Sequence, residues 1–207
     1  MNKKMILERW SNADYLNSIE GCIQSICSDR ASIDGADLAG LSIGPDAVLS
    51  EFKNKSLYHS NISNSNLSYA NISGGMSNSS FVNVIFIKSH LDRCILLECT
   101  VVNCDFSHSR LVAKMDDTVC ENSNFTGAKF GAGSTGLEYG GRRVKFINCD
   151  FSGAVFNKVE FRASKFINCS FSGARFINCD LRGVKFDGEV MPSASQFEKM
   201  DVPTWAR

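Results

Sequence analysis

Nine cysteines and one glycine-rich motif are the residues of this 207-residue chain whose types and spacing could do chemistry. Cys94, Cys99 and Cys104 recur at every fifth position, and three thiolates held together could bind a zinc ion. Residues 131–136 read GAGSTG and match the GxGxxG fingerprint of a dinucleotide-binding turn. That fingerprint needs a helix directly after it, because the helix N-terminus holds the pyrophosphate. The residues that follow, LEYGGRR, are a poor helix start, so we expect no nucleotide cofactor.

The three histidines give no better evidence for catalysis. His59, His90 and His108 have no acidic or nucleophilic partner set nearby in the sequence. General acid–base and nucleophilic mechanisms both need such partners within hydrogen-bond reach. The sequence therefore predicts a protein that is not an enzyme and that carries no cofactor.

A large apolar residue at every fifth position is the dominant pattern of the chain. Neither the 3.6-residue period of a helix nor the alternation of a strand produces a strict period of five, so the pattern predicts a repeat architecture. A small or apolar residue precedes most of the large ones by two positions. The predicted structural core contains the large residues Phe146, Phe151, Phe156, Phe161, Phe166, Phe171, Phe176, Leu181 and Phe186 and the small residues Cys149, Cys169 and Cys179.

A longer period of twenty residues is superimposed on the period of five. Residues 146–165 and 166–185 are identical at eleven of twenty positions. Since twenty is four fives, we expect one structural turn to contain four pentads. Successive turns should then place Phe146 beneath Phe166 and Phe156 beneath Phe176, at the ~4.8 Å spacing of neighbouring strands. Such an interior is filled by side chains and leaves little room for a buried active site.

The same pattern accounts for most of the cysteines. Six occupy the small inward position, where a thiol packs as a small hydrophobe: Cys94, Cys99, Cys104, Cys149, Cys169 and Cys179. Because packing explains each of them, we predict no metal site. Cys149 and Cys169 should stack one turn apart, but parallel Cβ directions are poorly aimed for a disulfide. Free thiols are typical of a reducing compartment.

These repeats resemble the pentapeptide-repeat family, whose motif is a small residue, Asp or Asn, Leu or Phe, and two variable positions. Good copies are residues 36–38 (ADL), 70–72 (ANI), 104–106 (CDF), 149–151 (CDF) and 179–181 (CDL). The resemblance implies an all-β solenoid, a right-handed quadrilateral β-helix in which each side is one pentad and each coil has four. It covers roughly residues 31–190.

We expect three parts: an N-terminal, partly helical cap at 1–30, the β-helix at 31–190, and a C-terminal cap or tail at 191–207. The ends need covering because unpaired strand edges recruit other chains. Ser11 and Asp14 read as a capping box and predict a helix at about 12–26. The segment PSASQFEKM predicts a short helix at about 193–200.

The repeat is interrupted between Phe130 and Phe146, which are sixteen residues apart. Five glycines in this interval predict a projecting loop at 131–144. The loop carries Leu137, Tyr139, Arg142 and Arg143, an apolar, aromatic and basic mixture that is typical of contact surfaces. The alternative is an insertion at a coil corner that binds nothing. Smaller irregularities at 73–80 and 112–120 predict bulges or short excursions.

Charge is balanced overall but unevenly distributed. The chain has 22 basic and 22 acidic residues, yet residues 141–186 hold nine basic and three acidic ones. Lys145, Lys165 and Lys185 should form one column, and Arg162 and Arg182 a second column that pairs with Glu160 and Asp180. A basic wall beside a basic loop suits an acidic protein partner, or more weakly a nucleic acid. The alternative is an ordinary solvated wall. The predicted partner-binding residues are Leu137, Tyr139, Arg142, Arg143, Lys145, Arg162, Lys165, Arg182 and Lys185.

The family resemblance supplies an alternative function. Some members protect DNA gyrase and topoisomerase IV by imitating the shape and negative charge of duplex DNA, and these are usually strongly acidic. The balanced charge here favours instead a non-catalytic binding protein that engages a protein partner through its walls and its loop. DNA mimicry linked to quinolone or toxin resistance stays open, because the acidic region 29–121 could present one negative face. A toxin-immunity or effector role stays open as well.

The remaining expectations concern location and assembly. No apolar run approaches the ~20 residues that a membrane-spanning helix needs. We therefore expect a cytoplasmic bacterial protein without a membrane anchor or a small-molecule substrate. A homodimer through the C-terminal segment stays open.

Overall fold

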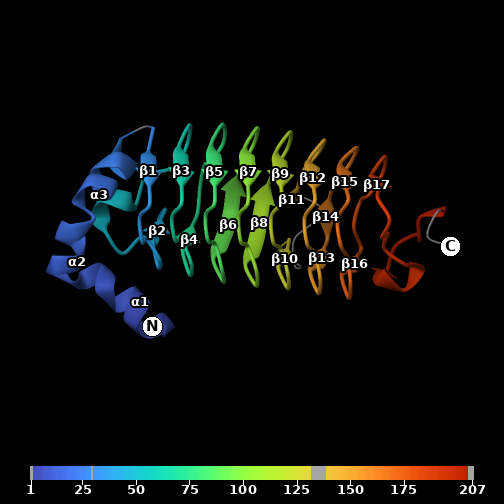
Figure 1. Cartoon of the computed structure of the whole chain (residues 1–207), viewed down its shortest axis with the longest axis horizontal. Coiled ribbons are helices and arrows are strands. Elements are labelled where there is room, and N and C mark those ends of the chain that lie inside the picture. The colour runs from blue at the N-terminus through green and yellow to red at the C-terminus, as the bar shows by residue number, and fades with distance from the viewer. Residues whose placement is uncertain (1, 29, 132–138, 205–207) are drawn as a thin grey trace.

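The computed structural model describes residues 2–28, 30–131 and 139–204. It is a right-handed, four-sided parallel β-helix of stacked coils, covered at its N-terminal end by three short α-helices (Figure 1). The predicted fold class is therefore confirmed. In the described residues, no helix is both long enough and apolar enough to cross a bilayer.

The first face of the β-helix is a parallel sheet of eight strands. Each strand contributes one residue to the interior and pairs in register with the strands before and after it. The strands are β1 (Ser32–Asp34), β3 (Asn61–Ser63), β5 (Ser80–Val82), β7 (Thr100–Val102), β9 (Val119–Glu121), β12 (Lys145–Ile147), β15 (Lys165–Ile167) and β17 (Lys185–Asp187).

The third face carries most of a second parallel sheet. Its strands are β2 (Ser42–Ile43), β4 (Asn71–Ile72), β6 (His90–Ile95), β8 (Arg110–Lys114), β10 (Lys129–Phe130), β13 (Val155–Asn157), β16 (Arg175–Ile177) and β18 (Phe197–Glu198). The fourth face contains β11 (Tyr139–Gly140) and β14 (Val159–Glu160), which pair with each other. On the second face, successive coils are joined by single parallel bridges, of which the first involves Asp37 and the last involves Ser170.

Columns of aromatic rings fill the interior. The ring centroids of Phe146 and Phe166 are 4.9 Å apart, and those of Phe156 and Phe176 are 4.6 Å apart. Rings on neighbouring faces meet edge to face, as Phe146 and Phe151 do at 5.1 Å. Burying each ring stabilises the fold by roughly 1.5–3 kcal/mol, and stacked or edge-to-face pairs add about 0.5–1.5 kcal/mol. Stacking along the axis confirms the predicted period of twenty.

Asparagine side chains stabilise the corner after the first face. Asn64, Asn83 and Asn103 have φ between 48° and 55°, a left-handed conformation that asparagine tolerates better than most residues. The side-chain amide of Asn83 donates to the side-chain oxygen of Asn64 at 2.9 Å, and that of Asn103 donates to Asn83 at 3.2 Å. The recurring asparagine therefore satisfies both the tight turn and the coil-to-coil contact.

The N-terminal cap differs from the predicted single helix at 12–26. It consists of α1 (Lys3–Glu8), a 3₁₀ turn η1 (Arg9–Ser11), α2 (Ala13–Ser18) and α3 (Glu20–Cys27). The N-cap of α2 is Asn12 rather than Ser11, since the Asn12 side chain accepts the backbone N–H of Tyr15 at 3.0 Å. The prediction missed α1 because one amphipathic turn gives little periodicity.

The cap is attached to the first coil by buried polar contacts. The indole N–H of Trp10 donates to the carbonyl of Ala39 at 2.9 Å, and Trp10 is only 2% exposed. The Arg9 guanidinium donates to the same carbonyl at 2.8 Å and to the Asp37 carboxylate at 2.7 Å. The hydrogen bond from Arg9 holds the pKa of Asp37 below its usual range. The cap thus satisfies carbonyl groups that the end of a solenoid would otherwise leave unpaired.

At the C-terminal end, the predicted helix at 193–200 is wrong. The segment forms a single 3₁₀ turn η3 (Ala194–Gln196) and then β18, which adds to the edge of β16. The Gln196 amide donates to the carbonyls of Phe171 and Ala174 at 2.6 and 2.9 Å, and Phe197 stacks on Phe176 at 5.1 Å. Pairing with the last coil outweighs the weak helical propensity of this short segment.

The predicted loop at 131–144 is also too long at its C-terminal side. Tyr139 and Gly140 form β11, which pairs with Val159 and Glu160 of β14, so residues 139–144 belong to a regular coil. Leu137 lies outside the described residues. Gly140 has φ +111°, and a Cβ there would overlap the carbonyl oxygen of Glu160. Glycine is needed at this position because two backbones approach closely within the wall, and this part of the chain does not project from it.

The two smaller irregularities have one common cause. Ile72 and Met76 are both buried and four residues apart, and so are Leu111 and Met115. Each pair spans the corner between the third and fourth faces, and one residue of the usual five is missing there. The pairing of β6 with β8 therefore shifts by one residue between Asp92 and Cys94. The predicted bulges or excursions at 73–80 and 112–120 are therefore single-residue deletions in the coil.

Candidate functional site

The lysine column, defined as Lys145, Lys165 and Lys185, lies on the first face. The three residues are paired in register on β12, β15 and β17, which confirms the predicted alignment. All three are exposed, and none has an ion pair with another described residue. Their Cα atoms follow the ~4.8 Å strand spacing, so three positive charges are concentrated along one edge of this face.

Apolar side chains lie directly beside the lysine column. Ile147 and Ile167, the outward residues on the other side of each strand centre, are half-buried and paired in register. Toward the N-terminal end the row continues through Glu121 to Val102 and Val82. At the other end it finishes at Asp187. Half-exposed β-branched residues next to unpaired cations give this face both apolar area and charge. That combination is typical of protein interfaces.

The arginine column, defined as Arg142, Arg162 and Arg182, lies on the fourth face and differs from the lysine column. Arg142 donates to Glu160 at 2.7 Å, and Arg162 lies 3.3 Å from Glu160 and 2.7 Å from Asp180. Arg182 donates to Asp180 at 2.7 Å. These arginines are therefore held within the protein by carboxylates on the same and neighbouring coils, and the predicted pairing with Glu160 and Asp180 is present.

The acids in this network are well shielded. The side chains of Glu160 and Asp180 are only 16% and 9% exposed. Hydrogen bonds from Arg182 and Arg162 hold the pKa of Asp180 far below its usual range, despite the opposing effect of burial. Networked, partly buried pairs contribute more to stability than isolated surface pairs. The arginine column acts primarily to join coils.

The other residues predicted for partner binding are divided in the same way. Arg143 forms two hydrogen bonds of 2.6 Å with the Asp117 carboxylate of the preceding coil. Tyr139 is half-buried in β11. The structure thus separates the predicted residues into the lysine column, which is unpaired, and Arg142, Arg143, Arg162 and Arg182, which are paired.

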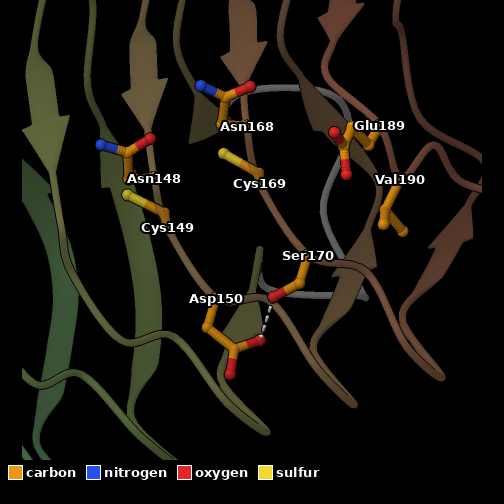
Figure 2. Close-up of a pocket in the computed structure, with 8 residues that line it drawn as sticks. All are labelled: Asn148, Cys149, Asp150, Asn168, Cys169, Ser170, Glu189 and Val190. Carbon is orange, nitrogen blue, oxygen red and sulfur yellow. Dashed lines mark hydrogen bonds between the residues drawn. The ribbon is translucent and has the colours of Figure 1, made fainter.

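One shallow depression lies at the corner between the first and second faces (Figure 2). It has a volume of about 500 Å³ and is lined by residues of two consecutive coils, among them Cys149 and Cys169, and by Glu189 and Val190 of the segment that follows β17. Both cysteines are buried, and each thiol contacts a backbone carbonyl of the coil below, at 3.5 Å. Beside them, Ser170 donates to Asp150 at 2.7 Å (Figure 2). Ser170 and Asp150 at this corner thus satisfy each other's hydrogen-bonding groups.

Four of the buried thiols are poor nucleophiles. Burial raises the pKa of Cys94 to about 12 and those of Cys99, Cys104 and Cys179 to about 11. A thiol with such a pKa is almost entirely protonated at neutral pH, and the thiolate is the reactive form. In the described residues, no group of three or more His, Cys, Asp or Glu side chains is placed to hold a metal ion.

Acidic side chains do not gather on one face. In the described N-terminal coils they are distributed around the column: Asp34 and Glu121 on the first face, Asp37 and Asp105 on the second, Asp92 on the third, and Glu98, Asp116 and Asp117 at the end of the fourth. Several are neutralised locally, as Asp37 is by Arg9. The continuous negative face that residues 29–121 could have formed is absent from the described coils.

Sequence reasoning missed a third basic column, which lies on the third face. His90, Arg110 and Lys129 are paired in register on β6, β8 and β10. All three directly precede a large core residue, so the pentad pattern contained the signal. Spacings of twenty and then nineteen residues concealed the column.

Comparisons with known proteins support this architecture. Residues 142–204 match the family described as pentapeptide repeat region. The fold is similar to a trypsin-treated form of QnrB1, a plasmid-mediated fluoroquinolone resistance protein, with 20% identity over 74% of this chain and 73% of that chain and a TM-score of 0.56. A search of curated proteins gave no match.

Two further structures were matched with lower scores. A second trypsin-treated form of QnrB1 has 18% identity, covers 75% of this chain and 92% of that chain, and has a TM-score of 0.40. HetL, a pentapeptide-repeat protein involved in heterocyst differentiation regulation in the cyanobacterium Nostoc, has 13% identity, covers 89% and 96% of the two chains, and has a TM-score of 0.18. Residues 142–204 thus match the pentapeptide-repeat family, and the pentad repeat and four-sided coils extend the same architecture over the described β-helix.

Proposed function

We propose that this protein is a non-catalytic binding protein whose C-terminal coils engage an acidic surface of a protein partner through the first face. The observation that carries the proposal is the lysine column, whose charges are unpaired in the described structure while the neighbouring arginine column is fully paired. Cations left without carboxylates are available to an external partner. Complementary charge of this kind steers association and sets specificity.

The apolar surface next to the column supports a protein as the partner. Ile147 and Ile167 lie beside the lysines, and a shallow depression of about 530 Å³ at the end of the face includes Val184 and Met191. Apolar contacts at the centre of an interface and charges at its rim are the usual arrangement in protein complexes. We include Tyr139 only as a peripheral contact of the adjoining fourth face. Leu137 stays a prediction from the sequence.

Charge reversal tests this function. The triple variant Lys145→Glu/Lys165→Glu/Lys185→Glu should lose the protein that wild-type protein captures from cell lysate, and the purified partner should bind it at least about tenfold more weakly, which corresponds to about 1.4 kcal/mol. The matched control reverses three exposed lysines outside the column, Lys4, Lys53 and Lys199, and should retain capture. Equal capture by both triple variants, or equal loss, would reject the first face as the binding surface.

Protection of a topoisomerase is the second candidate, because the fold is similar to that of a fluoroquinolone resistance protein. The dispersed acidic side chains weigh against DNA mimicry as its mechanism. Gyrase supercoiling measured with and without a quinolone, across a titration of the protein, tests it directly. Protection at micromolar concentration that survives in the lysine-column triple variant would favour this candidate over the first.

A further inference from the structure

The cationic groove, defined as the hollow over His90, His108, Arg110, Lys129 and Arg175, runs along the third face. His90, Arg110 and Lys129 are consecutive in the register of β6, β8 and β10, and Val155 and Arg175 follow them on β13 and β16. The hollow has a volume of about 660 Å³. It extends over five coils, which at ~4.8 Å per coil gives a length of about 19 Å.

Small residues create the hollow. Val155 lies in the row where the other coils of the groove present histidine, arginine or lysine. Gly131, with φ +88°, leaves the position after Phe130 without a side chain. A Cβ on Gly131 would overlap the carbonyl oxygen of Asn157, so the two coils approach closely here. Gly127 lies beneath the His108 ring, and a Cβ there would come within 2.6 Å of the ring nitrogen Nδ1. Long cationic side chains thus border a floor made of glycine, valine and asparagine.

The groove is lined by cationic and neutral side chains. None of its lining residues is acidic. Arg110 and Lys129 are exposed and have no ion pair with another described residue, whereas Arg175 donates to Glu198 at 2.6 and 2.8 Å. The nearest carboxylate on β6, that of Asp92, lies 3.5 Å from Arg93. Burial and the charges of Lys3 and Arg110 lower the pKa of His90, as expected in a positive environment.

We infer that the cationic groove binds an extended acidic segment of a polypeptide, laid along the axis of the β-helix. An extended chain rises about 3.3 Å per residue, so a length of about 19 Å accommodates about six residues. The Arg110 guanidinium can bind a carboxylate through two parallel hydrogen bonds, and the Lys129 ammonium adds a point charge. Val155 and Ile177 offer apolar contact between the charges.

A single-stranded nucleic acid fits this groove less well. Proteins that bind single strands stack the bases on exposed aromatic rings. Phe130 is the one Phe, Tyr or Trp residue in the lining, and its ring is in the core and only 2% exposed. Beside it the lining holds the small imidazole rings of His90 and His108, so the groove offers charge with a limited stacking surface, which favours an acidic peptide. It is also independent of the proposed interface, because it lies on the third face and the lysine column on the first.

Fluorescence anisotropy with a fluorescein-labelled octaglutamate peptide at low ionic strength tests the inference. The peptide should bind wild-type protein, and Arg110→Glu/Lys129→Glu should weaken it at least about tenfold, since two attractions become repulsions. The matched control Arg30→Glu/Lys53→Glu changes the net charge equally at exposed positions outside both proposed binding surfaces and should alter the affinity less than about threefold. Far-UV circular dichroism and melting temperature establish that both variants are folded.

Three outcomes would overturn the inference. The first is no binding of octaglutamate to wild-type protein, and the second is equal loss in the two double variants, which would indicate a general charge effect. The third is tighter binding of a labelled eight-nucleotide oligothymidine than of octaglutamate, with the same loss in Arg110→Glu/Lys129→Glu, which would assign the groove to nucleic acid. None of these outcomes bears on the lysine column, so the two proposals fail separately.

Discussion

Phe156 and Phe176 stack one coil apart with ring centroids separated by 4.6 Å and ring planes inclined by only 2°. Both rings are completely buried. Phe156 also stacks on Phe130 of the preceding coil at 4.7 Å, so its ring is held between two others. The continuity of the interior depends on such rings.

Phe156→Ala should destabilise the protein by about 3–5 kcal/mol, because it removes a fully buried ring and leaves a cavity between two rings that cannot close. The measurement is urea unfolding followed by far-UV circular dichroism. Lys165→Ala, an exposed change on a neighbouring strand, should alter stability by less than about 0.5 kcal/mol. A loss below about 1 kcal/mol for Phe156→Ala would show that the ring column contributes little.

Gly140→Ala should be strongly destabilising, in contrast to Gly21→Ala. At Gly140, φ is +111° and a Cβ would overlap the backbone of Glu160, so the coil must shift. Gly21 lies in α3 with nothing within 4 Å of an added Cβ, and alanine there should stabilise the helix by about 0.5–1 kcal/mol. Thermal melting should show a lower melting temperature for Gly140→Ala and a higher one for Gly21→Ala. If both shift the melting temperature in the same direction, the close approach is not a constraint.

Asp180→Asn should reduce stability at neutral pH by about 1.5–3 kcal/mol, because Arg162 and Arg182 lose a charged acceptor. The pKa of Asp180 is lower in the folded protein than in the unfolded chain. Its contribution is therefore complete above the unfolded value of about 3.9 and is lost as the pH falls through the folded value. The difference between wild type and variant should be constant from pH 5 to 7 and shrink below about pH 4.

The measurement for Asp180 is urea unfolding at a series of pH values. Asp201→Asn, an exposed acidic position near the C-terminal end, serves as the control and should change stability by less than about 0.5 kcal/mol at neutral pH. A difference for Asp180→Asn that stays constant down to pH 2 would mean that its carboxylate is not the stabilising group.

Most of the sequence-predicted architecture follows from one property, the size of the side chain at each inward position. Phe146, Phe166 and Phe186 stack as the period of twenty required. Register-dependent features were predicted equally well, including the lysine column. The period did not show which cations would find carboxylates, because that depends on rotamers across coils, as at Arg162 and Asp180.

The capping segments were predicted less accurately, since they do not repeat. Residues 193–200 have helix-forming amino acids, but their backbone groups gain more by pairing with the open edge of β16. Similarly, the glycines at 131 and 140 mark a loop in most contexts, whereas here they permit close approach between coils. Local propensity gives way to the hydrogen bonds that the neighbouring coil offers.

Thiol labelling provides a further prediction. Seven of the nine cysteines are buried, and only Cys22 and Cys27 are half-buried. At pH 8, an aromatic disulfide reagent should therefore modify at most about two thiols rapidly in the folded protein, because buried thiols are neither ionised nor accessible. In urea all nine should react. Rapid modification of more than two thiols without denaturant would show that the coils open readily.

The asparagine side chains that join Asn64, Asn83 and Asn103 have a consequence for how this molecule can change length. Because each coil presents the same corner to its neighbours, a duplicated stretch of about twenty residues can be inserted as one additional coil and leave the existing contacts in place. Each such addition would move the two ends apart by about 4.8 Å. The length of the β-helix is thus set in steps of one whole coil.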